Sequence, residues 1–111
     1  MLLDTQPYKV PAVTEPIEPW RQLLLDAADL IERTHWWNGK SVARPRPAYC
    51  ALTAITMAGD THGVSLAHEA ATYFSHYVGI GDQRIPHWND APGRTKVEVL
   101  AAYDRAIELA A

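Results

Sequence analysis

The residues best suited to chemistry gather in two stretches of the chain. Residues 33–50 read RTHWWNGKSVARPRPAYC and end at Cys50, the only cysteine. Residues 87–90 read HWND. A cysteine attacks as its thiolate, which nearby cations and a helix N-terminus favour, and it needs a base. The two stretches together contain the residue types of a thiol-dependent site.

Cys50 is the candidate nucleophile of such a site. His35 or His87 would act as its base, and Asn89 or Asp90 would orient that imidazole. This hypothesis makes the chain a thiol-dependent enzyme, or a protein with a small-ligand pocket centred on Cys50.

A structural interpretation of Cys50 competes with the catalytic one. Cys50 shares a face of a predicted helix with Ala54 and Ala58, which points the thiol inward. Free cysteines are among the most buried residue types. We therefore favour a buried structural cysteine and a chain that is not an enzyme, with the enzyme as the alternative.

The middle of the first stretch is rich in tryptophan and cations. It contains Trp36, Trp37, Lys40, Arg44 and Arg46. In single-stranded nucleic-acid binding, aromatic rings stack on bases and cations meet phosphates. Trp and Arg are also enriched in the hot spots of protein interfaces. A structural alternative is that at least one tryptophan folds back over the core.

The charge of the chain favours a protein or small-ligand partner over nucleic acid. Ten Lys and Arg face thirteen Asp and Glu, which leaves a net charge of −3. Proteins that bind nucleic acid through bulk charge are basic. The interacting surface would join the basic-aromatic loop to His87, Trp88, Asn89 and Asp90.

The His87–Asp90 cluster also has a structural interpretation. Asn and Asp are turn residues whose side chains bond nearby backbone. Trp88 would then plug the helical body while Asn89 or Asp90 bonds loop backbone. We favour this interpretation over a catalytic role.

No metal or cofactor is predicted. His62, His68 and His76 offer no pair at the i, i+4 spacing of a helical zinc motif, and HExxH is absent from the sequence. The glycine-rich loops that bind nucleotides and the GxSxG elbow are absent as well.

The elements that must position these residues read as helices. Apolar residues recur at helical spacing over residues 18–34 and from residue 95 to the end of the chain. Thr95 and Glu98 have the spacing of a capping box.

Two shorter helices are expected between them. One covers residues 47–58, with Pro47 in its first turn and Gly59 as its stop. The other covers residues 66–78, capped by Ser65 and ended by Gly79.

The fold class predicted is all-α: a compact four-helix array with two long loops, residues 35–46 and 79–94. Residues 1–16 contain three prolines and are predicted to form an extended N-terminal arm on a single domain of residues 17–111. We expect no signal peptide, no membrane-spanning segment and a cytoplasmic location.

The order of features resembles a family of small uncharacterised proteins found in actinobacteria and their phages. The residues that carry the resemblance are a tryptophan after the first helix, residues 50–55 (CALTAI), residues 88–90 (WND), and Arg94-Thr95 and residues 98–100 (EVL) before Ala106-Ile107. It covers roughly residues 20–110 and implies an intracellular helical domain, phage-encoded in some cases, without an assigned activity. Our leading hypothesis is a small protein-interaction module that uses the Trp/Arg-rich loop.

Overall fold

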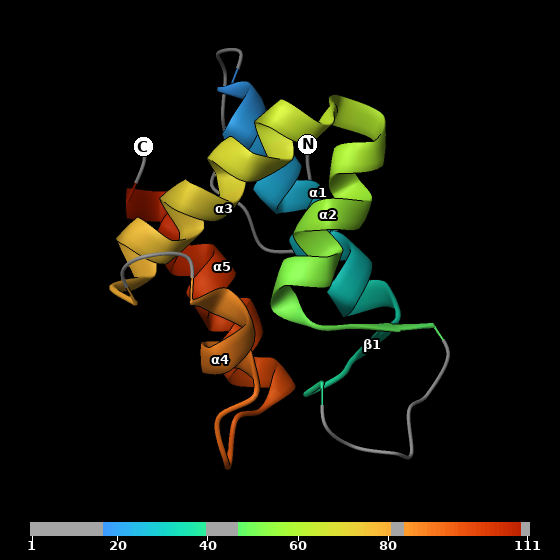
Figure 1. Ribbon diagram of the computed structural model, residues 1–111, viewed down its shortest axis with the longest axis vertical. Coiled ribbons are helices and arrows are strands. Elements are labelled where there is room, and N and C mark those ends of the chain that lie inside the picture. The colour runs from blue at the N-terminus through green and yellow to red at the C-terminus, as the bar shows by residue number, and fades with distance from the viewer. Residues whose placement is uncertain (1–16, 40–46, 81–83, 110–111) are drawn as a thin grey trace, which may run out of the picture.

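The computed structural model describes residues 17–39, 47–80 and 84–109, with the side chain of Leu109 left out. Five helices and one pair of short strands lie in these ranges (Figure 1). In chain order they are α1 (Pro19–Arg33), β1 (His35–Trp36), β2 (Ala48–Tyr49), α2 (Ala51–His62), α3 (Val64–Val78), α4 (Ile85–Asn89) and α5 (Lys96–Leu109). The mostly helical prediction is confirmed, but α4 and the strand pair were not expected. The predicted arm, residues 1–16, lies outside the described residues.

The helical body consists of α1, α2, α3 and α5. Most of the apolar side of α1 is buried as expected, and Leu23, Leu24 and Ile31 are fully buried, whereas Leu30 is half-buried. The helix α1 contacts each of the other three helices. The largest buried side chains facing it are Phe74 of α3 and Tyr103 of α5, whose ring centroids lie 4.8 Å apart. Burial of these side chains supplies most of the driving force for folding.

Small residues let α2 approach its neighbours closely. Ala51, Ala54 and Ala58 of α2 are buried. A Cβ atom built on Gly59 would lie 2.6 Å from the Cβ of Ala67 on α3, closer than packed carbons can approach. Gly59 is therefore a contact point between α2 and α3, and the prediction that it ends the helix is wrong.

The predicted start of α2 is also wrong. The chain is extended through Ala48 and Tyr49, and Cys50 is the N-cap residue, with φ −79° and ψ 171°. The helix begins at Ala51 and runs to His62, where Gly63 ends it with φ 110°. Pairing with β1 holds this segment extended, although Pro47 suits a helix start.

The helix α3 begins at Val64, before the predicted Ser65 cap, and no side chain caps it. Its end is as predicted, because Gly79 adopts the left-handed conformation (φ 85°) that favours glycine.

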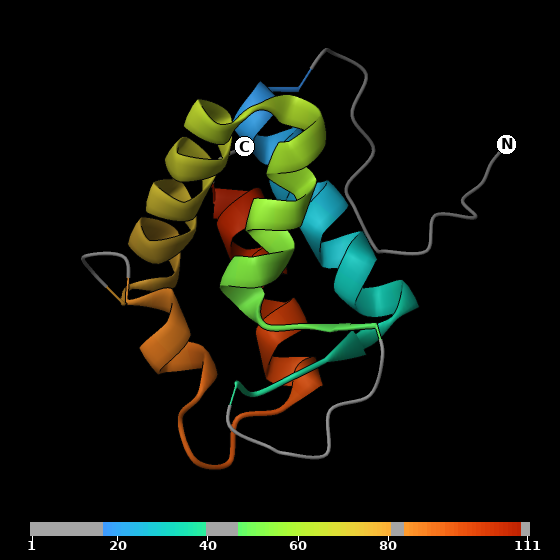
Figure 2. The same cartoon turned by 45° about the vertical axis from the view of Figure 1, so that its right-hand side comes forward.

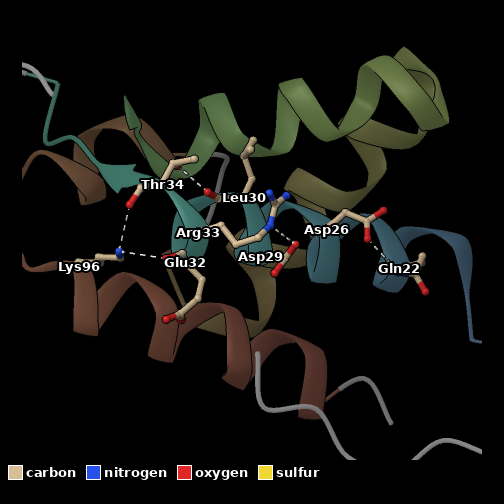
Figure 3. A network of polar contacts seen from close by, with 8 residues as sticks. All are labelled: Gln22, Asp26, Asp29, Leu30, Glu32, Arg33, Thr34 and Lys96. Atoms are coloured by element: carbon tan, nitrogen blue, oxygen red, sulfur yellow. Dashed lines mark hydrogen bonds and ion pairs between the residues drawn. The ribbon is translucent and has the colours of Figure 1, made fainter. Parts of the chain in front are cut away.

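The capping box of α5 is confirmed. The Glu98 N–H donates to Thr95 Oγ1 (3.2 Å), and the Thr95 N–H donates to Glu98 Oε1 (3.0 Å). The next residue, Lys96, joins α5 to the end of α1, because its ammonium group donates to the carbonyls of Glu32 and Thr34 (3.4 Å each; Figure 3). A cation there complements the partial negative charge of a helix C-terminus.

The remaining elements lie at one end of the body. The strands β1 and β2 are parallel, with His35 opposite Ala48 and Trp36 opposite Tyr49. Figures 1 and 2 show this pair, α4 and the beginning of α5 at the same end. Ile85, which lies in the predicted loop 79–94, is the buried first residue of α4. Among the described residues, no helix has the length and apolar character needed to cross a bilayer.

Candidate functional site

The side chain of Asn89 joins the two stretches that the sequence singled out. It is fully buried at the end of α4. Its Oδ1 accepts hydrogen bonds from Trp36 Nε1 (2.6 Å) and from the Ala51 N–H (3.0 Å). Its Nδ2 donates to the Trp37 carbonyl (3.1 Å) and to Asp90 Oδ1 (3.0 Å). Both amide hydrogens and both oxygen lone pairs are thus used.

Packing of α4 against the body places Asn89 there. Ile85 is fully buried, and the ring of Trp88 meets Phe74 edge-on at a centroid distance of 5.9 Å. Pro86 suits the first turn of a helix because that turn does not need its missing N–H. With Ile85 and Trp88 seated on the body, Asn89 faces the beginning of α2.

The first residue of α2 is held from two sides. The N–H of Ala51 has no acceptor within its own helix, so Asn89 supplies one. The carbonyl of Ala51 accepts from the buried hydroxyl of Tyr103 (2.6 Å). Burial, and secondarily the electrostatic effect of the nearby Cys50, raises the pKa of Tyr103 well above its usual value, which keeps the hydroxyl protonated as a donor.

A contact between Gly39 and Asp90 joins the same two stretches at a second place. Gly39 has φ 80°, which disfavours other residues. A Cβ atom there would lie 2.5 Å from Asp90 Oδ1, so the carboxylate occupies the space that a side chain would need. The sequence WWNG therefore fits against WND as one assembly, which we call the clamp: residues 36–39, Asn89 and Asp90.

The ring of Trp88 packs against two other side chains, those of Phe74 and Arg94. The guanidinium of Arg94 lies 4.3 Å from the centre of its ring, and Arg94 Nε donates to the Trp88 carbonyl (2.9 Å). Together with the contact to Phe74, this arrangement agrees with the structural interpretation of Trp88.

Cys50 is half-buried and does not share the inward face of α2, because it precedes the helix. Its Sγ accepts from the Thr53 N–H (3.4 Å) and lies 3.0 Å from Thr53 Oγ1. His35 and His87 are exposed, and neither hydrogen-bonds to the thiol in the described part of the chain. The thiol caps a helix, and the structure does not pair it with a base.

The other histidines are dispersed. His62 of α2 pairs with Asp26 of α1 (Nε2–Oδ2 2.7 Å), and the ring of His76 meets Tyr77 edge-on. Within residues 17–39, 47–80 and 84–109, no three His, Cys, Asp or Glu side chains are grouped closely enough to hold a metal ion.

Among the predicted surface residues that the structure describes, most are partly or fully buried. Trp36, Trp37 and Asp90 are half-buried, whereas His87 is exposed. Because Asn89 is fully buried, it cannot touch a partner. The three predicted cations Lys40, Arg44 and Arg46 lie outside the described residues.

Sequence reasoning missed two contributors to this region. Gly39 carries a signal, since the pair Asn38-Gly39 is typical of a turn with positive φ. Tyr103 carries none, because its partner Ala51 lies 52 positions away and the ring also fits an ordinary helical core.

Comparison with known proteins places the chain in one family. Neither the curated proteins nor the solved structures contain a match to it. A family model described as a family of unknown function (DUF6197) matches residues 16–109, which include every described element. The chain therefore belongs to the DUF6197 family of unknown function.

Proposed function

We propose that this protein is a small interaction module that binds another protein through the Trp36–Arg46 loop and the neighbouring His87. The observation that carries the proposal is the clamp. A buried amide with four hydrogen bonds, and a glycine fitted against a carboxylate, hold a non-helical segment on a helical body. Binding residues are commonly presented in this way, on a loop that a rigid scaffold positions.

The chemistry of the loop suits an acidic partner with an apolar recess. Residues 33–59 contain four cations and no acidic residue. Lys40, Arg44 and Arg46 would select the partner by charge, and Trp37 would provide apolar contact area. His87 is exposed on α4, the helix whose last residue, Asn89, bonds to Trp36 at the start of the loop.

A thiol-dependent enzyme is the second candidate. The half-buried position of Cys50 at the N-cap of α2 favours it, since a helix N-terminus stabilises a thiolate. The absence of a hydrogen-bonded base among the described residues weighs against it. Single-stranded nucleic-acid binding by the loop ranks third, because it depends on a few cations in an acidic chain.

The cellular setting is also part of the proposal. The likeness to proteins of actinobacteria and their phages suggests a module that works in the cytoplasm of a bacterial cell or of a phage-infected host. Its partner would then be a host or phage protein.

The test is a quantitative affinity capture with four immobilised proteins. These are the wild type, Trp37→Ala, Arg46→Ala and a control, Val64→Ala, whose side chain is 84% exposed at the start of α3. A true partner is retained by the wild type and by Val64→Ala and is depleted with both loop variants.

Each captured partner is then purified and titrated at two salt concentrations. Weaker binding at higher salt is expected for a charge-selected partner. Full retention of every partner by Trp37→Ala and Arg46→Ala contradicts the proposal. Binding of an oligonucleotide with a steep salt dependence supports the nucleic-acid alternative, and rapid, pH-dependent alkylation of Cys50 supports the thiol alternative.

A further inference from the structure

One oxygen atom of the clamp accepts two of its hydrogen bonds. Trp36 Nε1 and the Ala51 N–H both donate to Asn89 Oδ1, at 2.6 and 3.0 Å. One donor belongs to the strand β1 and the other to the first turn of α2. Because both bonds end on the same atom, displacement of Asn89 breaks them together.

Residues 36–39 are attached in other ways as well. β1 pairs with β2 over two residues, the Trp37 N–H donates to the Tyr49 carbonyl (3.1 Å), and Trp36 packs against the core. None of these four residues is fully buried, however. The body is attached differently, through fully buried side chains such as Leu23, Phe74 and Tyr103. Segments with few buried apolar groups open locally, at a lower free energy than the whole fold.

We propose that Asn89 is a positioning residue that latches residues 36–39 to the beginning of α2, and that this segment detaches as a unit while the helical body stays folded. The attached state presents Trp37 in a fixed position, so it is the state that binds a partner. The detached state frees the Trp36 indole N–H. The biological meaning of the latch rests on the proposed function, but the test below needs no partner.

The experiment is native-state hydrogen exchange followed by NMR at increasing, sub-denaturing guanidinium concentrations. The reporters are the Trp36 indole N–H and the Ala51 amide for the latch, and the amides of Ile55 and Val99 for the body. The indole signal of Trp36 is assigned by its loss in Trp36→Phe, since the chain has four tryptophans.

In the wild type, the two latch protons should share one protection factor, at least tenfold below that of Ile55 and Val99. Their exchange should depend weakly on guanidinium, because local opening exposes little surface, whereas exchange of the body amides should depend steeply on it. If both latch protons follow the steep dependence of the body, the segment opens only by global unfolding and the proposal is overturned.

Two variants identify Asn89 as the latch. Asn89→Leu keeps a buried side chain of similar size and removes all four bonds, so protection of the Ala51 amide should fall at least tenfold while Ile55 changes much less. Trp36→Phe retains a ring and removes one donor, so it tests the same coupling if Asn89→Leu does not fold. It should also lower protection at Ala51.

Tyr103→Phe is the matched control. It removes the other side-chain bond to Ala51 from the body side, so it should lower the protection of Ile55 and Val99 more than that of the Trp36 indole. An Ala51 amide that stays fully protected in Trp36→Phe contradicts the latch. That result would not affect the affinity-capture test of the proposed function. A negative affinity-capture result would likewise not affect the hydrogen-exchange test of the latch.

Discussion

The helical body and the clamp are held together by different physical means. The body packs alanines and a few large side chains, such as Phe74 and Tyr103, over a wide apolar area. The clamp uses one amide, one carboxylate and one glycine. Apolar packing is non-directional, so the body should respond to changes in volume. Hydrogen bonds are directional and specific, so the clamp should respond to changes in chemical groups at constant volume.

The largest effect is expected at Phe74, in the centre of the body. Its ring is fully buried and contacts both Trp88 and Tyr103. Phe74→Ala should lower the free energy of unfolding by about 3–5 kcal/mol, measured by chemical denaturation. Phe74→Leu, which keeps most of the apolar volume, is the control and should lose much less. Equal losses in the two variants would contradict a body that responds to volume.

Overpacking of the body is tested at Gly59. In a helix, alanine is favoured over glycine by up to about 1 kcal/mol. Because of the close approach to Ala67, Gly59→Ala should instead destabilise the protein. We expect its free energy of unfolding to fall by about 1–2 kcal/mol, since inserted carbons strain a packed core.

The double variant Gly59→Ala/Ala67→Gly provides the control for that contact. It moves the methyl group from one helix to the other and should recover part of the loss. No recovery would mean that the α2–α3 contact is not the cause.

Tyr103 connects the body to the start of α2, and Tyr103→Phe removes only a hydroxyl. We expect the free energy of unfolding to fall by about 1–2 kcal/mol near neutral pH, since the Ala51 carbonyl loses a buried donor. Denaturation of both proteins at pH 7 measures the difference.

The same residue predicts a pH dependence. The pKa of Tyr103 is raised in the folded state, chiefly by burial, whereas in the unfolded chain tyrosine ionises near pH 10. Its contribution is therefore fully present below about pH 10 and declines above it, by about 1.4 kcal/mol per pH unit. The difference in unfolding free energy between the wild type and Tyr103→Phe should therefore stay constant from pH 8.5 to about 10 and then shrink toward pH 11. Curves that stay parallel up to pH 11 would refute this prediction.

The smallest effect is expected at the capping box, where α5 begins. Thr95→Ala removes an exposed bond to the Glu98 N–H and should cost about 0.5–1 kcal/mol. Thr95→Ser should retain the cap. Thr61→Ala, an exposed threonine within α2, should change stability little. A loss at Thr61 as large as that at Thr95 would argue against a capping role.

Much of the body was predictable from the sequence because its signals are local. The apolar spacing of α1 and the Thr95–Glu98 pair of α5 act within a few residues of each other. The start of α2 was not predictable in this way. Pro47 and Gly59 carry helix-boundary signals, but pairing with β1 and contact with Ala67 override them.

The candidate site was predicted as two segments that form one surface, but the contacts that join them were not predicted. The unusual residue types of WWNG and HWND identified both stretches. That Asn89 is a buried connector, and not a contact for a partner, depends on bonds to Trp36 and Ala51, which lie 53 and 38 positions away. Spacing within one segment carries no information about such contacts.

The sequence by itself determined the helical class, the extent of α1 and α5, and the two stretches that merit experiment, because periodicity, caps and residue types are local properties. Only the tertiary structure decided that α4 seats Trp88 on Phe74, that Cys50 caps a helix, and that Asn89 closes the clamp. These features depend on which distant surfaces meet when the apolar faces are buried.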